Sequence, residues 1–118
     1  MYINEHEKNM WKPISLNDLK NFILSGELEL NDDQRKFWDL ISIEPEKWKE
    51  MEYGNEGGDF WVVAIFGREI IWYNDIEEGF NISGYVTYGT ISSYECSQSE
   101  LNYTVIEIMK RITSKRWY

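Results

Sequence analysis

Two apolar segments in the middle of the chain constrain the fold most strongly. Residues 60–66 (FWVVAIF) and 69–74 (EIIWYN) are rich in aromatic and β-branched side chains, which favour β-strands. Only Gly67 and Arg68 separate them, and a two-residue loop that begins with glycine is typical of a type II′ β-hairpin. The sequence therefore predicts an antiparallel hairpin at the centre of the fold.

Both faces of this predicted hairpin are apolar. The loop at residues 67–68 predicts three cross-strand pairs: Ile65 with Ile70, Val63 with Trp72, and Trp61 with Asn74. We expect the face that these pairs form to meet the helices. The opposite face carries Phe60, Val62, Ala64, Phe66, Ile71 and Tyr73. A sheet that is apolar on both faces has to be covered on both, at least in part, or has to bind a ligand.

Helix signals precede the hairpin. Ser15 and Asp18 form a Ser-x-x-Asp capping box that predicts the start of a helix, and Gly26 predicts its end. The predicted inward face of this helix comprises Leu16, Leu19, Phe22 and Ile23. Asn31 predicts the N-cap of a second helix. The apolar stripe of the second helix comprises Phe37, Trp38 and Ile41.

A short third helix is predicted to begin at Pro45, since proline is favoured at the first position of a helix. In this helix Trp48 and Met51 would face inward. The loop that follows contains three glycines before the hairpin starts at Phe60. Glycine breaks any helical period, so residues 52–59 are expected to be irregular.

The last helix is predicted from a second capping box, Ser-Gln-Ser-Glu at residues 97–100. Cys96 and Leu101 are placed as its hydrophobic staple. The single cysteine is therefore expected to act as a small apolar residue at the entry of a helix. The core-facing stripe of this helix comprises Leu101, Val105, Ile108, Met109 and Ile112.

Taken together, these elements predict a single α+β domain over residues 1–118. N-terminal helices precede a central antiparallel sheet of three to four strands, and a C-terminal helix closes the fold. Short strands broken by Gly84 and Gly89 complete the sheet between the hairpin and the last helix. Residues 1–13 are polar and are expected to be flexible, and 118 residues are enough for one domain.

The inventory of reactive side chains argues against catalysis. The sequence has one Cys and one His, too few for a zinc site or an internal disulfide. A Ser-His-Asp or Cys-His arrangement would have to use His6, in the polar N-terminal stretch. We therefore predict no catalytic residue, no cofactor and no enzymatic activity.

The net charge of -9 is unevenly distributed along the chain. Residues 69–109 contain no Lys or Arg, whereas the last nine residues contain four basic and no acidic side chains. The rest of the chain has 8 basic against 21 acidic residues, a formal charge of -13. Such a surface repels nucleic acids and acidic membranes and attracts a basic partner. The alternative is that the charge only keeps the protein in solution.

The tightest acidic cluster directly follows the hairpin and is flanked by aromatic residues. Carboxylates of this kind can bind Lys or Arg of a partner, and aromatic side chains often supply the buried anchors of interfaces. The acidic loop before the hairpin adds two more candidates. The predicted partner-binding residues are Asp75, Glu77, Glu78, Trp72, Tyr73, Phe80, Asp59 and Glu56.

The same residues permit other interpretations. The acidic cluster can be a solvated turn, and the aromatic residues can belong to the core. Several carboxylates could also bind a divalent cation. The cluster lacks the Asp-x-Asp-x-Asp-Gly spacing of a calcium loop, so no metal site is predicted.

The segment from Gly58 to Phe80 (GDFWVVAIFGREIIWYNDIEEGF) gives the sequence a resemblance to a known group of proteins. Together with Tyr88-Gly89 and Gln98-x-Glu100-Leu101, it resembles small acidic immunity proteins of bacterial toxin systems, including contact-dependent growth inhibition systems. The resemblance covers roughly residues 50–110. It implies a cytoplasmic protein that binds a toxin domain, often a basic nuclease, and blocks its active site.

Two other functions stay open at this point. The chain could be a small-molecule or peptide-binding regulatory domain with an aromatic pocket lined by Trp61, Trp72 and tyrosines. It could also mimic a nucleic acid, if its carboxylates were spaced like phosphates on one surface. An enclosed aromatic pocket would favour the first of these functions, and a flat acidic face would favour the toxin inhibitor. The sequence contains no apolar run long enough for a membrane span.

Overall fold

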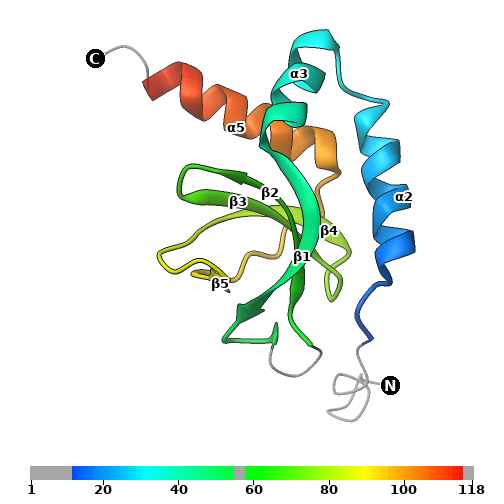
Figure 1. The fold of residues 1–118 in the computed structure, drawn as a ribbon, viewed down its shortest axis with the longest axis vertical. Helices are drawn as coiled ribbons and strands as arrows, with labels where there is room; N and C mark the ends of the chain where they lie inside the picture. Colours follow the sequence, from blue (N-terminus) through cyan, green and yellow to red (C-terminus); the bar gives the residue numbers. More distant parts are fainter. Residues whose placement is uncertain (1–11, 55–57, 116–118) are drawn as a thin grey trace.

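A computed structural model of the chain describes residues 12–54 and 58–115 and has the predicted α+β class (Figure 1). Residues 1–11 of the predicted flexible segment are outside the described residues. The elements are α2 (Leu16–Glu27), α3 (Asp32–Ile41), β1 (Ser42–Glu50), β2 (Phe60–Phe66), β3 (Glu69–Asn74), β4 (Gly79–Gly84), β5 (Thr90–Ile91) and α5 (Leu101–Lys115).

The sheet has five strands in the order β4-β3-β2-β1-β5. Neighbouring strands are antiparallel except β1 and β5, which are parallel. β5 lies in the stretch where short strands were predicted, whereas β1 was not predicted. The parallel pairing of β1 with β5 also departs from the predicted antiparallel sheet of three to four strands.

The predicted third helix is wrong, because Pro45 lies within β1. Trp48 is buried as predicted, but Met51 is 66% exposed. Proline occurs in strands at edges and bulges, where no N–H is required. Pro45 has such a place: the β1–β2 pairing is irregular between Ser42 and Glu46, and β5 pairs only with the last two residues of β1.

The β2–β3 hairpin is confirmed, with Ile65 opposite Ile70 and a positive φ of 58° at Gly67. A register shift between Val62 and Ala64 then changes the remaining pairs. Trp72 lies opposite Val62 instead of Val63, and Tyr73 lies opposite Trp61. The predicted choice of face is also wrong: Ile70 and Trp72 share a face as predicted, but it is the face away from the helices, and Tyr73 lies on the face toward them.

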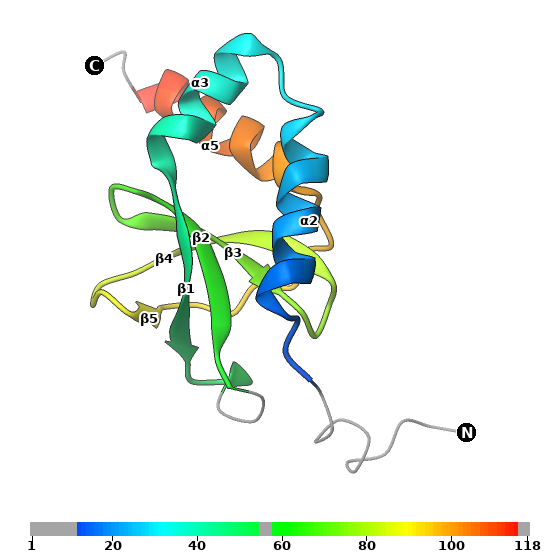
Figure 2. The same cartoon turned by 45° about the vertical axis from the view of Figure 1, so that its right-hand side comes forward.

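Both faces of the sheet are covered, as its composition requires (Figures 1 and 2). The face toward the helices packs against Leu19 of α2, Trp38 of α3 and Val105 of α5. The opposite face forms a second core, which the segment 85–98 with β5 covers. This second core consists of Trp48, Phe60, Val62, Ile70, Trp72 and Ile91, with Tyr85 and Tyr94 packed against it.

The N-caps of the first two helices are confirmed. The Ser15 side chain accepts a hydrogen bond from the Asp18 amide at 3.1 Å. Asn31 and Gln34 form a reciprocal capping box at the start of α3. Gly26, however, does not end α2. It is buried within the helix, and a Cβ atom at this position would be 2.6 Å from the Leu101 Cβ atom, so glycine permits the close approach of α5.

The predicted capping box of the last helix is wrong, although its core stripe is confirmed. The helix begins at Leu101, and the Ser97 amide instead donates to the Asn81 side chain at 2.7 Å. Cys96 is exposed and is no apolar staple. A long-range hydrogen bond to β4 thus replaces the local cap that the sequence pattern suggested.

Glu50 at the end of β1 is 3% exposed, and its carboxylate organises the turn that follows. It accepts hydrogen bonds from the amides of Glu52, Tyr53 and Gly54 at 2.9, 2.6 and 3.0 Å. We expect Glu50→Gln to lower the free energy of unfolding by about 2 kcal/mol, because a carboxamide is a weaker acceptor and turns a donor toward these amides. Urea denaturation measures the change. The exposed neighbour provides the control Lys49→Gln, and equal effects of the two substitutions would contradict this role.

Candidate functional site

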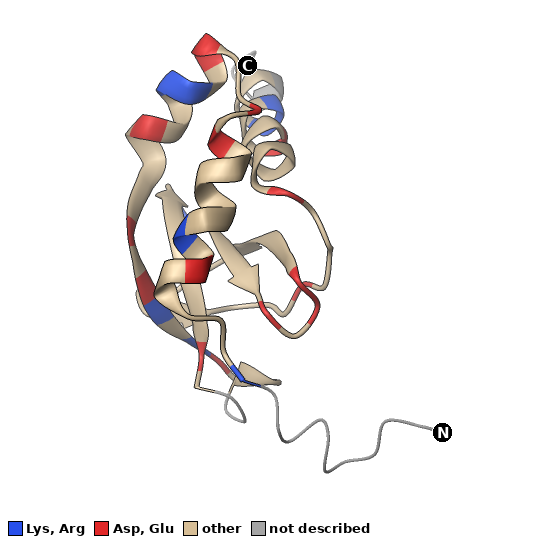
Figure 3. Cartoon of the chain, turned by 90° about the vertical axis from the view of Figure 1, so that its right-hand side faces the viewer, with Lys and Arg blue, Asp and Glu red and all other residues tan. Residues whose placement is uncertain are grey.

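The chain has a groove between α2 and the turn that joins β3 to β4. Two adjoining hollows, of about 230 and 450 Å³, share Phe22, Tyr73 and Glu78 in their linings. Asp18 and Asp75 line the larger hollow. We call the surface formed by these five residues the α2 groove. Figure 3 shows the acidic turn beside the N-terminal half of α2.

The start of α2 is tied to the sheet by Asp75. Its carboxylate accepts a hydrogen bond from the Ile14 amide at 2.6 Å, and the Trp61 indole donates to the Ile14 carbonyl oxygen at 3.1 Å. Ile14 directly precedes the N-cap of α2, so these contacts fix the helix next to the turn. Asp75 thus forms a wall of the groove and also holds it together.

The turn itself is shaped by Asn74, which is buried at the end of β3. The Asn74 side-chain oxygen accepts from the amides of Ile76 and Glu77 at 3.0 and 3.2 Å. Asn and Asp side chains commonly stabilise turns in this way. Glu78 follows with a positive φ of 61° and an exposed side chain, which lines both hollows.

Aromatic rings form the floor of the α2 groove. The Phe22 ring stacks on the Tyr73 ring with centroids 5.7 Å apart and an interplanar angle of 25°. Tyr73 in turn contacts Phe80 at 4.9 Å between centroids. Phe22 was predicted to face the core, but 49% of it is exposed, whereas Tyr73 is 6% exposed. The groove therefore combines an accessible aromatic ring with a buried phenol.

The electrostatics of the groove are acidic. Its larger hollow has three carboxylates, from Asp18, Asp75 and Glu78, against the ammonium group of Lys12. The pKa of Tyr73 is raised by burial and further by the charges of Glu78 and Asp75. The Tyr73 hydroxyl therefore stays protonated at neutral pH and can both donate and accept a hydrogen bond.

The structure brings together four of the predicted partner-binding residues: Asp75, Glu78, Tyr73 and Phe80. Phe80 is almost wholly buried, so it supports the groove as a core residue. Glu77 is half-buried, and its charge adds to the burial that raises the pKa of Tyr94, a residue packed against the second core. Trp72 is fully buried in that second core and leaves no surface for a partner.

Of the two candidates before the hairpin, Asp59 does not line the groove. Asp59 has a φ of 70°, and its backbone oxygen accepts from the Lys47 ammonium at 3.5 Å. Burial lowers the pKa of Lys47, an effect that the charges of Asp75 and Asp59 oppose. Glu56 lies outside the described residues.

Two residues of the groove were not predicted to contact a partner: Asp18 and Phe22. Each of them already has a local role in the sequence pattern, Asp18 as a capping residue and Phe22 as part of an apolar stripe. The only available signal was that an aromatic residue and a carboxylate, four positions apart, share one side of α2. Their proximity to the turn after β3 depends on the long-range Asp75–Ile14 contact.

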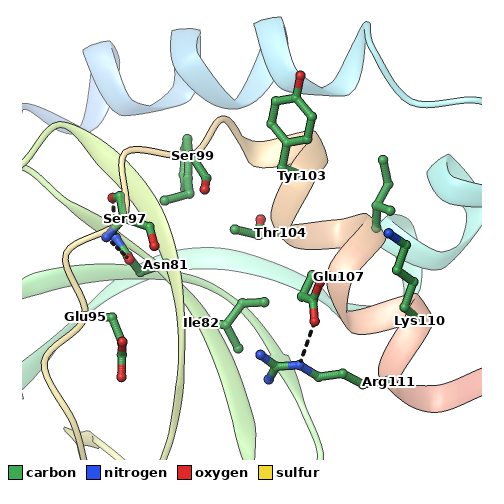
Figure 4. Close-up of a pocket in the computed structure, with 12 residues that line it drawn as sticks. Asn81, Ile82, Glu95, Ser97, Ser99, Tyr103, Thr104, Glu107, Lys110 and Arg111 are labelled. Atoms are coloured by element: carbon green, nitrogen blue, oxygen red, sulfur yellow. Dashed lines mark hydrogen bonds and ion pairs between the residues drawn. The ribbon is translucent and has the colours of Figure 1, made fainter. Parts of the chain in front are cut away.

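A separate, polar hollow of about 360 Å³ lies between β4, the segment before α5, and α5 itself (Figure 4). Its arginine is engaged by carboxylates: Arg111 contacts Glu69 at 2.6 Å and Glu107 at 3.3 Å. Trp61 and Trp72 line neither this hollow nor the α2 groove. The aromatic pocket suggested for a regulatory domain is therefore not formed by these tryptophans at either place.

Residues 12–54 and 58–115 contain neither a metal-binding cluster nor a membrane-spanning helix. No group of three or more His, Cys, Asp or Glu side chains in these ranges is arranged to hold a metal ion. None of the helices described there is long and apolar enough to cross a membrane.

Comparisons of the whole chain with protein-family models, curated proteins and solved structures found no match. The α2 groove and the charge distribution are therefore the observations on which a function can be argued.

Proposed function

We propose that this chain is an immunity protein, which binds a basic toxin domain in the cytoplasm and neutralises it without catalysis. The α2 groove is the observation that carries this proposal. It offers an accessible aromatic ring with three carboxylates around it, a combination suited to a basic protein surface. The resemblance of residues 50–110 to immunity proteins points to the same function.

The position of the groove in the charge pattern supports a toxin of the nuclease type. Such a toxin needs clustered Lys and Arg to hold a phosphate backbone. The β3–β4 turn lies in the 69–109 stretch, which has no Lys or Arg to repel such a cluster. An inhibitor that covers the cluster would exclude the nucleic acid and be attracted at long range.

The direct test is co-expression with the product of the neighbouring reading frame. We expect the two proteins to co-purify and the chain to protect cells from that product. If the neighbouring product is toxic and the chain neither binds it nor protects the cells, the proposal is wrong.

The contribution of the acidic groove is tested by charge reversal. We expect Glu78→Lys to slow association with the toxin about tenfold, because steering by peripheral charges acts mainly on the on-rate. Glu78 is preferable to Asp75, whose carboxylate also anchors α2. Glu29→Lys makes the same charge change at an exposed position after α2 and is the matched control. Surface plasmon resonance at two salt concentrations separates the effects, and equal rates for both variants would exclude the groove from the interface.

A further inference from the structure

The α2 groove contains a polar group that has no hydrogen-bond partner among the described residues. Tyr73 is 6% exposed and lines both hollows, and no described residue forms a hydrogen bond with its hydroxyl. Buried tyrosine hydroxyls usually have a hydrogen-bond partner. The Tyr73 hydroxyl is not among the wholly buried polar atoms without a partner, so it is open to the groove, where a bound molecule can contact it.

The charges of the groove restrict what that molecule can be. The side chains of Asp18 and Glu78 are exposed and form no ion pair with a described residue. The Asp75 carboxylate adds a third negative charge at the inner end, where it holds the Ile14 amide. A cationic group is the complement of this arrangement.

The exposed ring of Phe22 distinguishes between the two common cations. A guanidinium group is planar, stacks on aromatic faces and forms paired hydrogen bonds with carboxylates. A lysine ammonium group is compact and strongly hydrated, so it uses an aromatic floor less well. Phe22 is held in place by its stacking on Tyr73, which leaves an ordered surface for a planar cation.

We infer that the α2 groove is a binding site for an arginine side chain of the partner protein, with its guanidinium group on Phe22, between the carboxylates of Asp18 and Glu78 and within reach of the Tyr73 hydroxyl. This inference rests on the proposed function, since it names the side chain through which a basic toxin would be held. It also predicts that the groove binds a free arginine derivative in the absence of the toxin.

The experiment uses Nα-acetyl-arginine amide as the probe and the full chain labelled with ¹⁵N. We expect saturable amide shifts at Asp18, Phe22, Tyr73 and Glu78, with a Kd of about 10 mM. Nα-acetyl-lysine amide should bind at least about threefold more weakly, because it cannot stack as a plane. The neutral analogue Nα-acetyl-citrulline amide should give no saturable shifts at these residues.

Three variants test the contacts. Glu78→Gln should weaken binding of the arginine probe about fivefold, and Glu29→Gln, outside the groove, should leave it unchanged. Tyr73→Phe keeps the ring and removes only the hydroxyl. It should weaken binding about threefold and leave the unfolding midpoint unchanged, because the hydroxyl has no bond to a described residue.

Several outcomes would overturn the inference. The groove would show only a general attraction of cations in any of three cases. The amide shifts could be spread equally over other acidic segments, the lysine probe could bind as tightly as the arginine probe, or the Glu78→Gln variant could bind the arginine probe unchanged. Nuclear Overhauser contacts between residues 1–11 and the ring of Phe22 would show that the chain's own N-terminal segment is the occupant. If the toxin is neutralised but the arginine probe does not bind, this inference fails and the proposed function stands. If the probe binds but no toxin is neutralised, the proposed function fails.

Discussion

Replacing Gly79 with alanine is expected to lower the free energy of unfolding by about 3 kcal/mol. A Cβ atom at this position would be 2.3 Å from the Gln98 Cα atom and 2.4 Å from the Ser97 carbonyl oxygen. Both are backbone atoms, which cannot rotate away as a flexible side chain can. Hydrogen bonds hold the two segments together here, since the Phe80 amide donates to the Ser99 oxygen at 2.8 Å.

The strand offers a matched control for this prediction. At Gly84, at the other end of β4, the nearest atom to a new Cβ would be the Arg68 oxygen at 3.7 Å, an ordinary contact. Gly84→Ala should therefore change stability by less than about 1 kcal/mol. Urea denaturation of both variants makes the comparison. Equal losses would mean that the close approach at Gly79 does not limit the fold.

The second large effect is expected for Trp72→Ala, which should destabilise the fold by about 4 kcal/mol. Trp72 is fully buried, its ring centroid lies 4.8 Å from that of Phe60, and its indole donates to the Ser83 hydroxyl at 2.8 Å. Truncation would leave a cavity in the second core. Chemical denaturation, with binding of a hydrophobic dye as a second probe, measures the loss of packing.

Trp72→Phe separates this structural role from the predicted role in partner binding. It retains an aromatic ring, so we expect the free energy of unfolding to fall by about 2 kcal/mol. The molecules that stay folded should bind a partner as tightly as the unmodified protein. If Trp72 were an interface anchor, the same change would reduce affinity and leave stability nearly intact. That second result would contradict the burial of this residue.

Local signals explain which parts of the fold were predicted correctly. The caps at Ser15 and Asn31 and the hairpin loop at Gly67 depend on residues within a few positions, so the sequence displays them directly. Pro45 misled the prediction because a proline that begins a helix and a proline at a strand edge give the same local signal. Both faces of the hairpin are apolar, so the sequence could not show which of them meets the helices. The irregularity in β2 also leaves no signal in a run of apolar residues, and it changed the cross-strand partner of Trp72.

The candidate site was only half predictable for a related reason. Asp75, Glu78 and Tyr73 are close in sequence, and their proximity could be inferred. The other wall of the groove comes from α2, and its position is fixed by a hydrogen bond between residues 61 positions apart. The predicted aromatic anchors also differ in whether they reach the groove. Neighbouring residues on β3 point to opposite faces, so Tyr73 reaches the groove and Trp72 does not.

The segment 85–98 has a consequence for how the chain folds. It covers the second core and then leads directly into α5, which covers the first. Its strand β5 pairs in parallel with β1, joining Lys49 to Thr90 across more than a third of the chain. The second core cannot close before this segment packs on it, and the helix that completes the first core follows the same segment in the chain. Closing this long loop carries an entropic cost, so we expect the chain to fold more slowly than the local hairpin alone.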